Sequence, residues 1–232
     1  MEQKLHSLFE QYDTLLVLDT ETSGLRFEID EIIELSAVTV RLGTDGPEIA
    51  AEYDELIALS PAKRLDYRIT QLTGISEADL KEHGIPKKQA CADFAAMLSG
   101  GKTLIVAYNA HFDMSFLYYF LQRDGDPKCL CGAGMLDALS VYRDRREYPH
   151  KLCNAIEAYN LQDAVCNSHR AIDDVKATVE VLKAMEAECP DLARYINLFG
   201  YNPKYGVQGK RIRSVTYVPQ PYNSNGKLYE RL

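Results

Sequence analysis

The chain has 232 residues, of which 46% are hydrophobic and 26% charged, and its formal net charge is −8. These proportions exclude a disordered or fibrous polypeptide and are typical of a globular domain with a small appendage. No apolar run reaches the roughly 20 residues that span a bilayer, and the N-terminal segment is too polar for a signal peptide. We therefore expect a cytoplasmic protein that does not contact membranes.

The six cysteines are scattered, and none forms a Cys-x-x-Cys pair. Zinc-binding spacings are therefore absent, and without a secretion signal a disulfide framework is not expected. We predict free thiols.

Charge is distributed unevenly along the chain. The segment 200–232 contains six Lys or Arg residues, one acid and five of the 15 tyrosines, so its charge is +5 and that of residues 1–199 is −13. Such asymmetry favours a polyanionic partner, although a solvated basic surface has the same composition. The segment is either a small β appendage, with a strand at "SVTYV", or a partly extended arm.

The first half of the chain predicts strands and then short helices. Thr14–Leu18 is a continuous apolar run, typical of a central strand covered on both faces. The segments 32–42 and 48–57 flank a "GTDGP" turn and predict a hairpin. Helices are predicted at 69–76, ended by Gly74, then after Ser76, which caps its helix together with Asp79, and at 86–98.

The second half predicts one more buried strand, "TLIVA" (103–107), among helices. Asn109 is placed to cap the helix that follows this strand. Further helices are predicted in "MLDALSVYRDR" and "KLCNAIEAYN", and a long one over 171–187. This order predicts an α/β layered domain over residues 1–190 and a basic C-terminal extension over residues 191–232.

Two acids follow the first strand directly. Asp19 and Glu21 are two residues apart, so in extended backbone both side chains point the same way. Carboxyl ends of strands are where open α/β sheets place their sites. Two close carboxylates repel each other unless a cation neutralises them, and hard divalent cations prefer oxygen ligands.

Two further stretches carry acids at comparable places. Asp113 lies in the first turn of the helix after the strand 103–107, where an acid also stabilises the helix dipole. His169 and Asp174 are five residues apart, so on a helix they would not share a face. We expect different roles for them, with Asp174 a metal ligand and His169 a mobile acid–base group.

Together, D-x-E, N-x-x-F-D and H-x-A-x-x-D resemble the motifs of the DEDDh branch of DnaQ-like 3′→5′ exonucleases, such as the epsilon proofreading subunits of bacterial DNA polymerase III. The resemblance covers about residues 15–185 and implies a ribonuclease-H-like fold, with a mixed sheet flanked by helices. It implies two divalent cations, Mg²⁺ or Mn²⁺, and His169 as general base. The implied metal-binding acids are Asp19, Glu21, Asp113 and Asp174.

The same resemblance suggests residues that bind the substrate. Leu72 and Ile75 of "LTGI" resemble the apolar group that packs against the last bases, and Thr20, Thr22 and Phe112 are further candidates. A basic cluster (Arg143, Arg145, Arg146 and Lys151) either contacts the nucleic acid backbone or is solvated.

Three hypotheses on the substrate and the partner remain open. A single-stranded DNA 3′ end is favoured, in proofreading or repair, because the basic tail suits a long strand. An RNA-directed enzyme of the same branch is the alternative, since discrimination depends on contacts to the 2′-hydroxyl. The third reading is a binding or scaffold subunit of a DNA polymerase that acts through its tail. There "INLFG" (196–200) resembles a sliding-clamp motif, although packing on the domain is the expected role of this segment.

Overall fold

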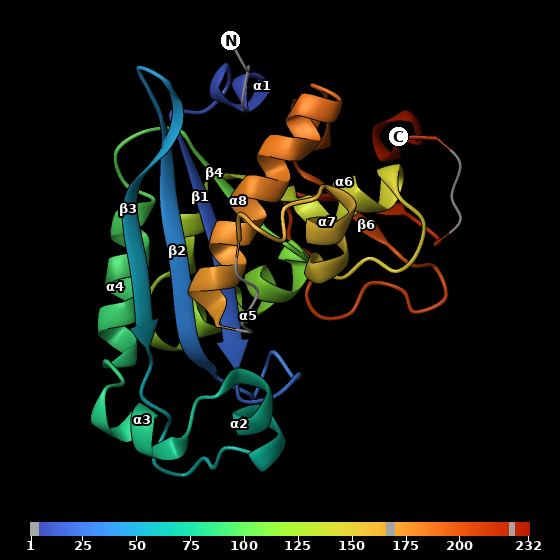
Figure 1. The fold of residues 1–232 in the computed structure, drawn as a ribbon. Coiled ribbons are helices and arrows are strands. Elements are labelled where there is room, and N and C mark those ends of the chain that lie inside the picture. The colour runs from blue at the N-terminus through green and yellow to red at the C-terminus, as the bar shows by residue number, and fades with distance from the viewer. Residues whose placement is uncertain (1–4, 166–169, 223–225) are drawn as a thin grey trace.

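A mixed sheet of five strands forms the centre of the computed structural model, which describes residues 5–165, 170–222 and 226–232 (Figure 1). The strand order is β3-β2-β1-β4-β5. The strands are β1 (Thr14–Thr22), β2 (Ile32–Gly43), β3 (Gly46–Leu56), β4 (Thr103–Ala107) and β5 (Gly134–Asp137). The first three pair antiparallel, whereas β1, β4 and β5 run parallel. The predicted α/β class with a mixed sheet is confirmed.

Helices cover both faces of this sheet. The α-helices are α1 (His6–Phe9), α2 (Tyr67–Thr73), α3 (Glu77–Glu82), α4 (Lys87–Met97), α5 (Ala110–Asp124), α6 (Ala138–Arg145), α7 (Leu152–Ala158) and α8 (Ala171–Glu188). The described ranges also contain three short 3₁₀ helices, η1 (Pro127–Leu130), η2 (Leu192–Tyr195) and η3 (Leu228–Glu230). None of the helices in the described part of the chain is long and apolar enough to cross a membrane.

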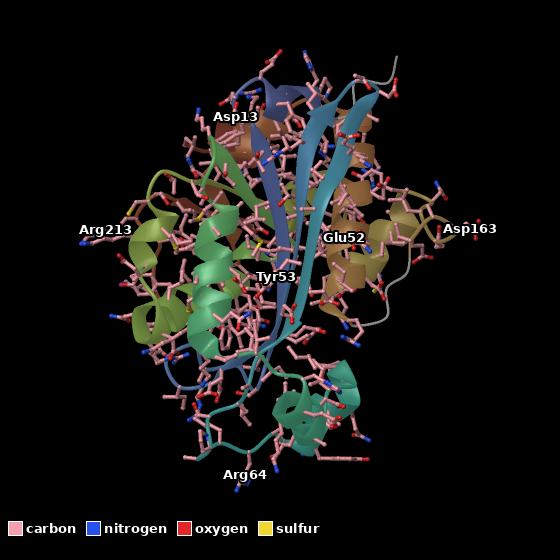
Figure 2. The ribbon with its side chains drawn as sticks, turned by 90° about the vertical axis from the view of Figure 1, so that its left-hand side faces the viewer. Asp13, Glu52, Tyr53, Arg64, Asp163 and Arg213 are labelled. Carbon is pink, nitrogen blue, oxygen red and sulfur yellow. The ribbon has the colours of Figure 1, made fainter. Side chains whose placement is uncertain are left out.

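Alternating side chains of β1 enter two separate cores. Leu15 and Val17 belong to the cluster that also contains buried residues of α6, α7 and α8. Leu16 and Leu18 belong to the cluster with α4 and α5. This period of two is what a strand covered on both faces requires. The strands accordingly lie between α4 and α8 in Figure 2.

The outer strand β3 shows the same alternation with polar side chains. Glu52 pairs with Lys176 of α8 at 2.8 Å, and Tyr53 donates a hydrogen bond to Asp93 of α4 at 3.3 Å. The labels of Glu52 and Tyr53 lie toward α8 and α4 respectively in Figure 2. One helix on each side is thus tied to the exposed edge strand.

The C-terminal extension folds against the domain. Its strand β6 (Leu198–Tyr201) pairs in parallel with β7 (Thr216–Pro219), which confirms the strand predicted in "SVTYV". Asn197 joins the extension to β5, since its side chain accepts from the Met135 backbone N–H at 2.9 Å. Leu198 and Phe199 are buried, so "INLFG" packs on the domain as expected. The division at residue 190 stays a prediction.

Two local predictions are confirmed only in part. The helix predicted in "MLDALSVYRDR" is found as α6 over Ala138–Arg145, but residues 135–137 belong to the buried strand β5, because this run completes the parallel edge beside β4. Asn109 occupies the N-cap position of α5 in the left-handed region (φ 76°), but its side chain makes no capping bond. In contrast, the Ser76–Asp79 capping box and the left-handed Gly74 at the end of α2 are confirmed. The cysteines in the described ranges are free thiols.

Candidate active site

The D-x-E pair lies on β1, within the strand, which continues to Thr22. Asp19 is paired with Ser36 of β2, and Glu21 is paired with Glu34. By the alternation of the strand, both acids share the face of Leu15 and Val17, which is covered by α8. Glu21 and Glu34 therefore stand side by side as like charges on neighbouring strands.

Asp113 brings a third carboxylate from the first turn of α5. Its side chain is 1% exposed, and its Oδ1 accepts hydrogen bonds from the Thr20 backbone N–H at 3.0 Å and from the Thr20 hydroxyl at 2.8 Å. The other oxygen, Oδ2, is buried and has no hydrogen-bond partner within the described residues. A buried carboxylate oxygen without a donor is costly, so it marks a position where a ligand belongs.

Asp174 lies in the first turn of α8, next to Asp173. Its charge acts on both acids of β1. His169 lies outside the described residues, so its expected position beside these acids stays a prediction. Three elements, β1, α5 and α8, thus deliver four carboxylates to one region.

The crowding of these acids changes their proton affinity. Burial, followed by the charges of Asp113 and Glu21, holds the pKa of Asp19 well above its ordinary value. Burial and the charge of Glu34 raise the pKa of Glu21 to about 8. Burial likewise raises the pKa of Asp113, against the lowering effect of its hydrogen bonds from Thr20. Each of these carboxyl groups is therefore stabilised when it binds a proton or when a cation binds beside it.

The chemistry of these donors fits hard divalent cations such as Mg²⁺ or Mn²⁺, and the unpartnered Oδ2 of Asp113 agrees with such a role. Within the part of the chain that the structure describes, no three His, Cys, Asp or Glu side chains stand close enough to hold an ion.

Two acids that the sequence motifs do not include, Glu34 and Asp137, bind the N-terminal ends of the helices that carry Asp174 and Asp113. Glu34 is 0% exposed, and its Oε1 accepts from Arg170 Nε at 3.0 Å and Nη2 at 2.6 Å. Its Oε2 accepts from the backbone N–H of Ala171 at 3.1 Å, the first residue of α8. A charged residue inside the apolar run "IIELSAV" was the signal available in the sequence.

Asp137 has the corresponding role at α5. It is 3% exposed, and its Oδ1 accepts from the backbone N–H groups of Asn109 and Ala110, both at 3.0 Å, and of Leu139 at 3.2 Å. Its Oδ2 accepts from the Ser140 hydroxyl at 2.5 Å. One carboxylate therefore caps α5 from another element and α6 from its own N-cap position.

The residues predicted to bind substrate differ in accessibility. The Thr20 and Thr22 hydroxyls are used within the protein, by Asp113 and by the Gly24 carbonyl at 2.7 Å. Ile75 is 3% exposed, whereas Leu72 is 58% exposed and free to contact a ligand. Phe112 is half-buried, with its ring 6.0 Å from that of Phe27.

The arginine cluster separates into two groups. Arg145 pairs with Asp191 at 2.5 Å and with Glu188, and Arg146 pairs with Glu188 at 2.7 Å. These two arginines therefore join α6 to the end of α8. Arg143 forms no ion pair with any residue that the structure describes.

Residues 16–182 match the Exonuclease (RNase_T) family. The chain belongs to this family. The family segment contains most of β1, all of β4 and α5, and the N-terminal part of α8, and therefore all four acids.

The chain is similar to segments of much longer DNA polymerases. The chain is 32% identical over 196 residues, or 83% of its length, to the PolC-type DNA polymerase III of Latilactobacillus sakei. It is 31% identical over 184 residues, or 78% of its length, to the PolC-type DNA polymerase III of Bacillus subtilis. The chain spans only 12% of each of these two relatives.

The fold is similar to that of solved exonucleases. A crystal structure of E. coli exonuclease I in complex with a dT13 oligonucleotide superposes with a TM-score of 0.70. The match covers 79% of this chain and 43% of that one, at 21% identity. The ribonuclease-H-like exonuclease fold expected from the motifs is therefore confirmed.

Proposed function

We propose that this chain is a metal-dependent 3′→5′ exonuclease that hydrolyses the terminal phosphodiester of single-stranded DNA. The observation that carries the proposal is the group of acids from β1, α5 and α8, whose charges raise one another's pKa. Such a group is unfavourable for folding and becomes favourable when cations bind. Membership of the Exonuclease family and the likeness to an exonuclease solved with an oligonucleotide support the same activity.

Asp19, Glu21, Asp113 and Asp174 would hold two divalent cations, Mg²⁺ or Mn²⁺. When bound, the cations acidify water and stabilise negative charge on the phosphoryl group. His169 would accept the proton of the attacking water, a task suited to its ordinary pKa of about 6.5. Water oxygen joins phosphorus as the bond to the 3′-oxygen breaks, so the product is a nucleoside 5′-monophosphate.

The described residues around the acids fix them in place. Thr20 holds Asp113 against β1 through two hydrogen bonds. Glu34 holds the start of α8 through Arg170 and Ala171, and Asp137 holds the start of α5. The backbone positions of the acids are therefore held before cations and substrate bind, which favours catalysis.

The polymerase relatives favour a setting in proofreading or repair, with a DNA polymerase as the proposed partner. In these relatives the similar segment is part of a much longer DNA polymerase chain, which is why we propose a polymerase as the partner.

The proposal is tested with single-stranded DNA labelled at its 5′ end. In Mg²⁺ or Mn²⁺ we expect a ladder that shortens from the 3′ end, with release of nucleoside 5′-monophosphates. EDTA should stop the reaction. Internal cuts, or no cleavage with either metal, would contradict the proposal. Faster cleavage of a matched RNA would keep the reaction class and replace the substrate.

A further inference from the structure

A pocket of about 220 Å³ lies between the start of α5 and the C-terminal extension. The residues that matter for its chemistry are Asn109, Phe112, Arg143, Tyr201, Tyr205 and Tyr222. Phe112 and Asp113 are consecutive residues in the first turn of α5, so the same helix end carries part of the pocket wall and one of the acids. The three tyrosines follow residue 182, where the match to the Exonuclease family ends. The extension therefore adds a wall of its own to the family fold.

Contacts with α5 fix this wall. The ring of His111 on α5 bonds through Nε2 with the Gln208 carbonyl and through Nδ1 with the Tyr217 hydroxyl, the latter at 3.0 Å. Gly209 has φ +76°, and a Cβ there would lie 2.5 Å from the Phe27 ring. Only glycine suits this position, so the segment is held closely against the domain.

Aromatic rings are exposed around the pocket. Tyr205 is 55% exposed and Tyr222 is 38% exposed. Tyr148, 67% exposed, lies next to Tyr222 with ring centroids 5.2 Å apart, and His150 stacks on Tyr222 at 6.0 Å. Exposed aromatic faces that frame a pocket are the platforms on which proteins stack unpaired bases.

Positive charge accompanies these rings. Arg143 lines the pocket, and its buried Nε has no hydrogen-bond partner among the residues described. Lys204 lies with its Nζ 5.3 Å from the centroid of Tyr205. An arginine that lacks a protein acceptor in a pocket suits a phosphate oxygen. The pocket thus combines stacking surfaces with a hydrogen-bond donor for a phosphate.

We propose that this pocket, formed jointly by α5, α6 and the extension, binds the interior nucleotides of a single-stranded nucleic acid. Bases stack on Tyr205 and Tyr222, and Arg143 binds a phosphate between them. The direction of the strand, with its 3′ end at Asp19 and Asp113, rests on the proposed function. Duplex DNA fits this pocket poorly, because its base faces are covered by their neighbours.

Binding is measured first, in EDTA, by fluorescence anisotropy of a labelled oligothymidylate of about 15 nucleotides, long enough to fill one such site. We expect Tyr205→Ala, Tyr222→Ala and Arg143→Ala each to raise Kd roughly tenfold. Tyr205→Phe, which keeps the ring, and Lys88→Ala, an exposed cation on α4, should bind like the unsubstituted chain. A Kd that is the same for all three alanine variants as for the unsubstituted chain would overturn the proposal, and so would no binding by the unsubstituted chain.

A second measurement separates this inference from the proposed function. Oligonucleotides carrying 5-iododeoxyuridine at the 3′ end or at interior positions are photocrosslinked in EDTA, where no hydrolysis is needed. Interior positions should crosslink to Tyr205 or Tyr222. Crosslinks to these tyrosines from the terminal base alone would overturn the inference. Interior crosslinks without any nuclease activity in Mg²⁺ or Mn²⁺ would uphold this site and overturn the proposed function.

Discussion

Glu34, buried within β2, binds Arg170 through two charge-assisted hydrogen bonds of 3.0 and 2.6 Å. The pair connects the centre of the sheet to the residue that precedes α8, and Ala171 donates to the same carboxylate. The helix carrying Asp174 therefore starts at a position fixed by β2. The same arginine lowers the pKa of Glu21, against the larger raising effects of burial and Glu34.

Breaking this pair should reduce both stability and activity. Arg170→Ala leaves the Glu34 carboxylate buried with one backbone donor, so we expect a loss of about 1–3 kcal/mol in the free energy of unfolding. A displaced α8 should also slow hydrolysis. Urea denaturation measures the first effect. In a double-mutant cycle with Glu34→Gln, the combined loss should be smaller than the sum of the single losses, and strict additivity would contradict the coupling.

Stability without metal should depend on the ionisation of Glu21. Its pKa of about 8 in the folded protein exceeds the ordinary 4.5, so the folded state binds more protons than the unfolded state between these values. The free energy of unfolding therefore falls as pH rises through this window. Glu21→Gln removes this loss, so in EDTA at pH 9 the variant should be more stable by on the order of 2 kcal/mol. At pH 4 the two proteins should be alike.

The matched control for this pH effect is Glu28→Gln, which changes an exposed glutamate near the same strand. The difference in the free energy of unfolding between this control and the unsubstituted chain should stay the same from pH 4 to pH 9. If Glu21→Gln behaved like this control in thermal unfolding, crowding of the acids would not govern the pH dependence.

Substitution of Asp137, which caps α5, should lower the free energy of unfolding far more than substitution of an ordinary helix cap. Asp137→Asn removes the charge from a buried carboxylate that accepts three backbone N–H bonds and one hydroxyl bond. We expect a loss of roughly 2–4 kcal/mol in the free energy of unfolding. Asp126→Asn is the control, because Asp126 caps η1 at an exposed position and should cost less than about 1 kcal/mol. Equal losses in chemical denaturation would refute the special role of Asp137.

Divalent cations should stabilise the folded chain. Mg²⁺ or Mn²⁺ at about 100 times its Kd adds roughly 2.7 kcal/mol, equivalent to about 5–10 °C in Tm. Asp19→Asn should abolish most of this increase, whereas Asp45→Asn at the exposed hairpin turn should keep it. Differential scanning calorimetry with and without the metal gives the shifts. A full shift for Asp19→Asn would place the cation elsewhere.

The sequence predicted the elements whose residues form clear local patterns. The run 14–18, the Ser76–Asp79 capping box and the stripe of α8 each carry such a pattern, and each was found. Strand β5 was missed because four residues give no measurable period, and its pairing with β4 is a tertiary contact.

The candidate site shows the same limit. Motif spacing led to Asp19, Glu21, Asp113 and Asp174, which are attached to neighbouring elements. Glu34 was missed because Arg170 is 136 residues away in sequence, and the role of Asp137 at α5 was missed because Asn109 is 28 residues away, so only the fold brings these partners together. The pocket under Tyr205 likewise depends on how the extension returns to α5, and no local pattern encodes that path.

The central claim is that Asp174, with the acids of β1 and α5, forms the metal-dependent site. The most direct test compares Asp174→Asn with Asp173→Asn, the adjacent acid in the same helical turn, on 5′-labelled single-stranded DNA in Mg²⁺. We predict that Asp174→Asn lowers the rate of 3′→5′ shortening by at least about 100-fold, whereas Asp173→Asn stays within a few-fold of the unsubstituted chain. Unchanged shortening by Asp174→Asn, or equal losses in both variants, would contradict the account.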